Sequence, residues 1–156
     1  MNKTNLTAEP GKHDLVVTRT FDAPRDLVFK AYTDPDIVSR WMGPSRLTMK
    51  IDKMDVRPGG AWRYTHSEED GTEYGFRGVY HDVVAPEKVV GTFEFEGVPG
   101  HVALETTTFE DQGGKTRLTV KSVYQSVEDR DGMLQSGMEG GMNESWARLD
   151  EVLAQL

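Results

Sequence analysis

The sequence contains no cysteine, which excludes disulfide bonds, thiolate nucleophiles and cysteine-ligated metal sites. It also lacks an excess of basic charge. Its 18 Lys and Arg residues stand against 26 Asp and Glu residues, and the formal net charge is -8 at pH 7. Such a surface is a poor match for the phosphates of nucleic acids and for anionic membranes. We therefore expect neither a nucleic acid nor a membrane as a partner.

Long apolar runs are absent as well. No stretch approaches the ~20 apolar residues that span a bilayer, and the N-terminus has no apolar signal-peptide core. A cytoplasmic location follows as the expectation. At 156 residues the chain has the length of one domain, and no repeat or linker divides it. Residues 1–12 are polar and contain Pro10-Gly11, so we predict a flexible segment there, followed by a single domain over residues 13–156.

Signatures of cofactor and metal chemistry are also missing. There is no nucleophile elbow, phosphate-binding glycine loop or dinucleotide fingerprint. The acidic run Glu68-Glu69-Asp70 beside His66 is better explained as an exposed hairpin loop than as a metal site. Glu94 and Glu96 share one strand face, where Arg or Lys partners on adjacent strands explain them more simply than a catalytic pair. We predict no metal and no cofactor.

The chain is rich in β-strand patterns. Segments with β-branched or alternating apolar residues, separated by short turns, predict seven strands. They are residues 15–21, 47–51, 61–66, 73–84, 89–96, 102–109 and 116–124. Two short helices fit between the first two strands, one starting at Pro24 and ending before Pro35, the other over residues 36–40. The short turns predict an antiparallel meander with one apolar face.

The C-terminal segment, residues 126–156, can cover that face. Its apolar side chains recur at steps of three and four, which is the spacing of one helical stripe. They are Leu134, Met138, Met142, Trp146, Leu149, Leu153 and Leu156. Gly137, Gly140 and Gly141 predict a break, so we expect a short helix capped by Ser126 and a longer helix from about Met138. The predicted fold class is α+β, with a curved antiparallel sheet of about seven strands around a long C-terminal helix.

An ordered set of short segments carries a family resemblance over nearly the whole chain from His13. The segments are Phe21-Asp-Ala-Pro24 with residues 28–35, Trp41-Met-Gly-Pro44, Val56-Arg-Pro-Gly-Gly60, Gly78 ahead of Ala85-Pro-Glu-Lys88, residues 113–120 and residues 141–149. This set resembles the Activator of Hsp90 ATPase homologue-like family of small bacterial proteins, in the START-like or Bet v 1-like (SRPBCC) superfamily. The resemblance implies the helix-grip fold, with a cavity between the sheet and the last helix.

Ligands of this superfamily lie in that cavity, so the resemblance implies a site for a small hydrophobic or aromatic molecule. At the matching positions, its lining would be Trp41, Trp62, Tyr64, Phe76, Tyr80, Phe93, Phe95, Met138, Met142 and Trp146. The competing interpretation is that these side chains pack against one another and fill a core. The sequence leaves this alternative open for each of them.

A binding protein without catalysis is the favoured function. One alternative is a polyketide cyclase-, aromatase- or hydrolase-like enzyme that uses the same cavity, with His66, Arg77 and Tyr80 as candidate catalytic residues. A further alternative, implied only by the family name, is an Hsp90-type co-chaperone, although we expect no room for the separate N-terminal domain of the eukaryotic co-chaperone. The sequence also leaves open whether the protein forms a homodimer.

Overall fold

The computed structural model describes residues 3–156 and contains one sheet with helices on its concave side. The strands are β1 (Asn5–Thr7), β2 (Asp14–Phe21), β3 (Thr48–Met54), β4 (Ala61–Ser67), β5 (Glu73–Val84), β6 (Lys88–Phe95), β7 (Val102–Asp111) and β8 (Thr116–Val123). The helices are α1 (Arg25–Thr33), α2 (Pro35–Trp41), α3 (Val127–Gln135) and α4 (Met138–Leu153). Every strand pair is antiparallel, in the order β1-β2-β8-β7-β6-β5-β4-β3.

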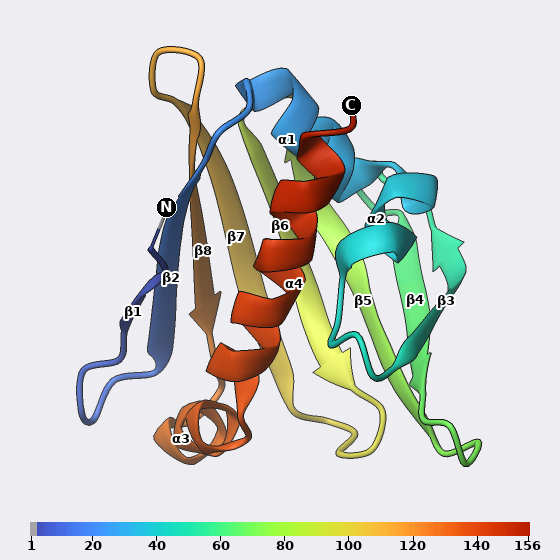
Figure 1. The fold of residues 1–156 in the computed structure, drawn as a ribbon. Helices are drawn as coiled ribbons and strands as arrows, with labels where there is room; N and C mark the ends of the chain where they lie inside the picture. Colours follow the sequence, from blue (N-terminus) through green and yellow to red (C-terminus); the bar gives the residue numbers. More distant parts are fainter. Residues whose placement is uncertain (1–2) are drawn as a thin grey trace.

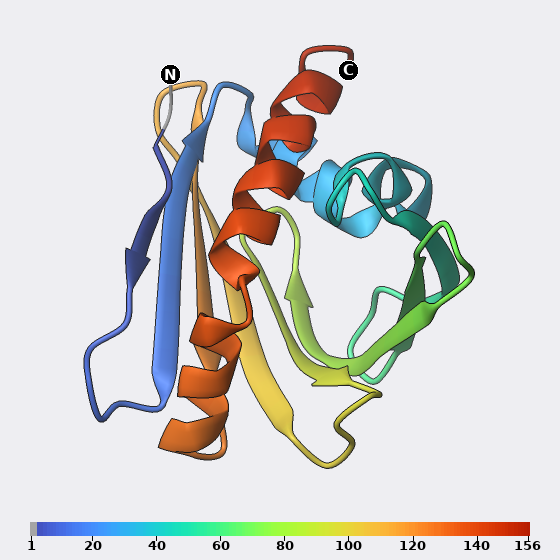
Figure 2. The ribbon, with the colours of Figure 1, turned by 60° about the horizontal axis from the view of Figure 1, so that its bottom comes forward.

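Helix α4 runs along the concave face, with α1 and α2 near its C-terminal end and α3 at the other end (Figure 1). A second view shows the sheet wrapping around α4, while β3 to β5 curl back toward α2 (Figure 2). The predicted α+β helix-grip fold is confirmed. The predicted strands correspond to β2 to β8, and the largest difference in bounds is at β3, which extends to Met54.

The strand that sequence patterns do not predict is β1, which lies within the expected flexible segment, residues 1–12. It pairs with β2 over Asn5–Thr7. The buried Arg130 of α3 holds the chain after β1, because its guanidinium donates hydrogen bonds to the backbone carbonyls of Glu9 (2.8 Å) and Asp14 (2.9 Å). These contacts join residues more than 100 positions apart, so no local pattern reveals them.

A single residue joins the two short helices. The backbone N–H of Asp34 donates to Lys30 O and closes α1, while its side chain accepts a hydrogen bond from Asp36 N (3.0 Å) and caps α2. Pro35, at the start of α2, needs no N–H partner there. The sharp turn directs Trp41 back toward α1, where its indole N–H donates to Ala31 O at 2.9 Å.

The packed core occupies the end of the concave face beneath α1, α2 and the C-terminal half of α4. Rings meet edge to face or at a tilt, the arrangements that aromatic pairs prefer. The Tyr32 and Trp41 centroids lie 4.8 Å apart, and those of Phe21 and Trp146 lie 5.6 Å apart. This end of the molecule is filled by side chains.

The predicted break between the last two helices is confirmed at Gly137, whose φ of 86° no other residue type adopts readily. The Ser126 hydroxyl caps α3 by accepting a hydrogen bond from Asp129 N at 3.0 Å. A Cβ added at Gly137 or at Gly140 would meet no atom within 4 Å. Substitution at these two positions therefore tests backbone conformation without a steric clash.

We predict that Gly137→Ala lowers the free energy of unfolding by about 1–2 kcal/mol, because alanine is strained in the left-handed region. Gly140→Ala is the matched control inside α4 and should raise it by about 0.5–1 kcal/mol. Urea unfolding followed by circular dichroism measures both. Equal stabilities for Gly137→Ala and the wild type would show that the helix break does not depend on this glycine.

Candidate functional site

Inward-facing aromatic side chains of β4, β5 and β6 form a continuous layer on the concave face. Tyr64 lies opposite Phe76 in the sheet register, and Phe76 lies opposite Phe95. The ring centroids are 5.3 Å apart for Trp62 and Tyr64, 5.3 Å for Tyr64 and Phe76, and 5.1 Å for Phe76 and Phe95. The layer is therefore built from strand alternation and cross-strand pairing.

Gly78 in β5 allows two members of this layer to meet across it. It lies opposite Trp62, and a Cβ at this position would be 2.6 Å from the indole nitrogen and would clash with Thr92 O. With no side chain there, the Trp62 and Phe93 rings approach to 6.1 Å between centroids, although their strands are not neighbours. Gly78 thus fixes the position of Trp62.

Three adjoining hollows lie against this layer. The inner hollow, about 530 Å³, is bounded by the sheet and by α3 and α4. The side hollow, about 190 Å³, lies toward α1, α2 and β3, and the end hollow, about 540 Å³, lies beside α3. Tyr64, Phe93 and Glu105 line both the inner and the side hollow, and Phe93 also lines the end hollow. The hollows therefore share walls.

Eight of the ten predicted lining residues border these hollows. They are Trp62, Tyr64, Phe76, Tyr80, Phe93, Phe95, Met138 and Met142. Trp41 and Trp146 lie instead in the packed core, each 2% exposed. The indole N–H of Trp146 donates to Tyr32 OH at 2.9 Å, so its polar atom is already paired. Ligand contact by the eight stays a prediction.

The Trp41-Met-Gly-Pro44 segment is tied directly to α4. Gly43 N donates to Ser145 Oγ at 2.8 Å, and the Arg148 guanidinium donates to the carbonyls of Gly43 and Arg40, both at 3.0 Å. Gly43 has a φ of 93°, and a Cβ there would clash with the His66 ring. This glycine therefore serves both the turn and the close packing of the histidine.

His66 lies on the inner face of β4 and lines the inner hollow. It is 6% exposed, and its buried Nδ1 has no hydrogen-bond partner among residues 3–156. Burial, with a smaller contribution from Arg148, lowers the pKa of His66 below its usual value. The imidazole is therefore neutral at pH 7, and its Nδ1 keeps an unused hydrogen-bonding capacity in a buried position beside Gly43.

Glu105 is a polar residue of the hollows that the sequence reasoning missed. Ser122 Oγ donates to its carboxylate at 3.0 Å. Its remaining accessible surface borders the inner and side hollows. Burial raises the pKa of Glu105 above its usual value. Strand alternation could have revealed it, because Ala103 and Phe109 on the same strand are buried at even spacing from it.

Phenol groups line the inner and side hollows together with this carboxylate. Burial is the main cause that raises the pKa of Tyr32, Tyr64 and Tyr124, and the charge of Glu105 raises each further, which indicates that all three lie within its electrostatic reach. Burial also raises the pKa of Tyr80 to about 12. These tyrosines remain protonated at neutral pH, so the inner and side hollows present hydroxyl groups and the Glu105 carboxyl group among aromatic side chains.

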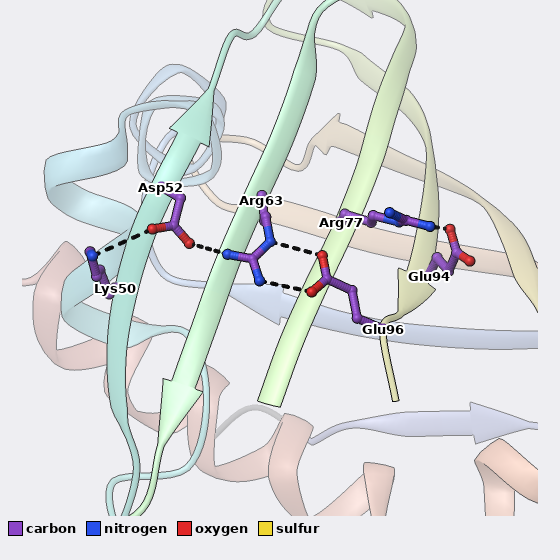
Figure 3. Close-up of polar contacts among 6 residues, drawn as sticks. All are labelled: Lys50, Asp52, Arg63, Arg77, Glu94 and Glu96. Carbon is purple, nitrogen blue, oxygen red and sulfur yellow. Dashed lines mark hydrogen bonds and ion pairs between the residues drawn. The ribbon is translucent and has the colours of Figure 1, made fainter. Parts of the chain in front are cut away.

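Arg77 lies on the opposite, convex face. It pairs with Glu94 at 3.1 Å, while Arg63 binds Glu96 through two nitrogens (2.8 and 2.7 Å) and Asp52 at 2.6 Å. Figure 3 shows these ion pairs crossing the strands from β3 to the end of β6. The predicted Arg partner on an adjacent strand is confirmed for Glu94, which pairs with Arg77 of β5. Glu96 also has an Arg partner, but Arg63 reaches it from β4, across β5. The placement of Arg77 argues against the catalytic role considered for it.

Among residues 3–156, no three His, Asp or Glu side chains gather in a way that could hold a metal ion. In the same part of the chain, no helix has the length and apolar character required to cross a membrane.

The model of the family described as Activator of Hsp90 ATPase homolog 1-like protein matches residues 22–154. The chain belongs to this family. Its fold is that of the START-like, Bet v 1-like (SRPBCC) superfamily, which confirms the resemblance found in the sequence.

Solved structures of similar proteins share the fold over their full length. A protein from Rhodobacter sphaeroides is 24% identical with a TM-score of 0.91, covering 99% of this chain and 100% of that one. One from Arthrobacter aurescens is 25% identical with a TM-score of 0.88, covering 97% and 92%. One from Staphylococcus epidermidis is 26% identical with a TM-score of 0.82, covering 96% and 94%. A search of curated proteins found no match.

We predict that Glu105→Gln raises the melting temperature by a few degrees at pH 8 and leaves it nearly unchanged at pH 4. A carboxyl group whose pKa is raised on folding contributes most to stability below its unfolded pKa of ~4.3, and that contribution is lost as pH rises through the folded pKa. Glutamine resembles the protonated form at every pH. Thermal unfolding across this pH range measures the difference.

Glu110→Gln is the matched control, because Glu110 lies exposed on the same strand. It should change the melting temperature little at either pH. A Glu105→Gln variant that is less stable than the wild type at pH 8 would contradict the prediction, since it would mean that the folded protein stabilises the carboxylate.

Proposed function

We propose that this protein binds a small hydrophobic or aromatic molecule in the inner hollow. One observation carries the proposal: the helix that packs tightly over one end of the concave face leaves about 530 Å³ open over the aromatic layer at the other end. Ligand pockets have volumes of roughly 300–1,000 Å³ and are lined mainly by apolar and aromatic groups with a few polar ones. The inner hollow has this character.

The lining suits a ligand with a flat or flexible apolar body. Phe76 and Phe93 contribute aromatic rings from the sheet, while Met138 and Met142 contribute thioethers from α4. Methionine side chains adapt to irregular shapes because they are unbranched and polarizable. Family membership supports the proposal, since helix-grip proteins hold ligands between the sheet and the last helix.

We predict that compounds from a panel of fatty acids, sterols, flavonoids and aromatic polyketides raise the melting temperature, because a ligand that binds only the folded state stabilises it. Gly141→Leu should abolish this shift. Gly141 borders the inner hollow, and a Cβ there would meet no atom within 4 Å, so the leucine can extend into the open space. Differential scanning fluorimetry measures the shifts.

Gly140→Leu is the matched control, since this neighbouring glycine is exposed, equally free of close contacts and not among the lining residues. It should keep the shift. The proposal fails if no compound stabilises the wild type, or if both leucine variants respond to ligand as the wild type does.

An enzyme of the cyclase, aromatase or hydrolase kind is the second candidate. The observation that favours it is that His66 and Glu105, two ionisable groups, both border the inner hollow. Of the candidates considered from the sequence, Tyr80 borders the side hollow. His66→Gln should then abolish turnover while keeping ligand-induced stabilisation. Unchanged turnover in this variant would remove the role of His66.

An Hsp90-type chaperone and a second copy of the chain remain predicted partners. A pull-down with the bacterial Hsp90 homologue and size-exclusion chromatography with light scattering would test them.

A further inference from the structure

Glu105 is a partly buried carboxyl group with no cationic partner among residues 3–156. No Lys, Arg or His side chain of residues 3–156 forms an ion pair with it, and its one side-chain hydrogen bond comes from Ser122. A carboxylate in such surroundings is costly unless a charge compensates it. Glu105 lies in the wall shared by the inner and side hollows. A cationic group of a molecule that enters either hollow could therefore compensate its negative charge.

The cationic side chains nearby have other partners or positions. Arg19 pairs with Asp150 at 2.5 Å, and Arg148 donates hydrogen bonds to the carbonyls of Gly43 and Arg40. Arg46 borders the inner hollow but is exposed and pairs with Glu68 at 2.8 Å. Lys53 borders the side hollow from an exposed position on β3. No cationic side chain in the described part of the chain therefore neutralises Glu105.

Aromatic side chains border the inner hollow together with this carboxylate. Tyr64, Phe76 and Phe93 line it with Glu105, and the rings of Tyr64 and Phe76 are stacked 5.3 Å apart. Such a lining offers apolar contact to the body of a ligand, while the carboxylate offers a partner for a positive charge. The combination matches a positively charged nitrogen attached to an apolar body.

We propose that the ligand is a hydrophobic amine whose protonated nitrogen pairs with Glu105 while its apolar body lies against Tyr64, Phe76 and Phe93 in the inner hollow. The inference rests on the proposed function and specifies its ligand class. An alcohol of the same shape would satisfy hydrogen bonds but would not compensate the charge. The net charge of -8 also favours the approach of a cation over that of an anion.

The test uses three probes that share an indole body, namely tryptamine, tryptophol and indoleacetate. Isothermal titration calorimetry at pH 7.5 measures their affinities for the full-length protein. Tryptamine should bind about tenfold or more tightly than tryptophol, since a buried ion pair to a carboxylate is stronger than a neutral hydrogen bond. Indoleacetate should bind most weakly, because its carboxylate repels Glu105.

The Glu105→Gln variant should lose this preference. Its affinity for tryptamine should fall to that for tryptophol, while its affinity for tryptophol stays within about twofold of the wild type, because glutamine keeps the shape and hydrogen-bonding capacity of the site. Glu110→Gln, on the same strand but exposed, should bind all three probes as the wild type does. Thermal unfolding verifies that both variants are folded.

The outcomes separate the inference from the proposed function. Equal binding of tryptamine and tryptophol to the wild type, or a tryptamine preference that survives Glu105→Gln, overturns the inference and leaves hydrophobic binding in place. Stabilisation by the earlier panel without binding of any indole probe also overturns the inference. If neither the panel nor the probes bind, both proposals are wrong.

Discussion

One helix cannot cover the concave face of an eight-stranded sheet, and most features of this molecule depend on that mismatch. A helix with its side chains is about 10–12 Å across, whereas strands lie about 4.8 Å apart. Helix α4 therefore spans only part of the sheet, and its buried side chains Trp146 and Leu149 pack with residues of β2, β7 and β8. The inner face of β4 to β6 is left to aromatic side chains that border open space.

Missing side chains in β5 organise both faces of the sheet at once. On the concave face, Gly78 lets Trp62 and Phe93 meet across the strand between them. On the convex face, a Cβ at Gly75 would clash with the Glu96 carboxylate, so this glycine lets Arg63 reach Glu96 over the same strand (Figure 3). Because these two positions carry no side chain, residues of β4 interact with residues at β6 although the two strands are not paired. The Trp62 and Phe93 rings approach each other on one face, and Arg63 binds Glu96 on the other.

The sequence predicted the elements well because their signals are local. Alternation located the strands, and Gly137 located the helix break. The sequence did not show that Trp41 and Trp146 lie in the packed core while the other aromatic residues border the hollows. That difference depends on how the helices pack on the sheet, and these contacts join residues that are far apart in the sequence. Strand β1 was missed for a similar reason, since its neighbouring chain is held by Arg130 from α3.

Glu105 was missed for a different reason. Its inward direction follows from alternation, but a carboxyl group on an apolar face contradicts the expectation that charged residues face solvent. Strand alternation indicated an inward-facing side chain, but the general rule that charged residues face solvent was given more weight. Such a contradiction between pattern and polarity is itself typical of functional positions.

Phe93 borders all three hollows, and its ring centroid lies 6.1 Å from that of Trp62 across Gly78. A change of side-chain rotamer at Phe93 would therefore alter the walls of three hollows and the surroundings of Trp62 at the same time. The indole of Trp62 is thus placed to act as an intrinsic spectroscopic probe of the interior.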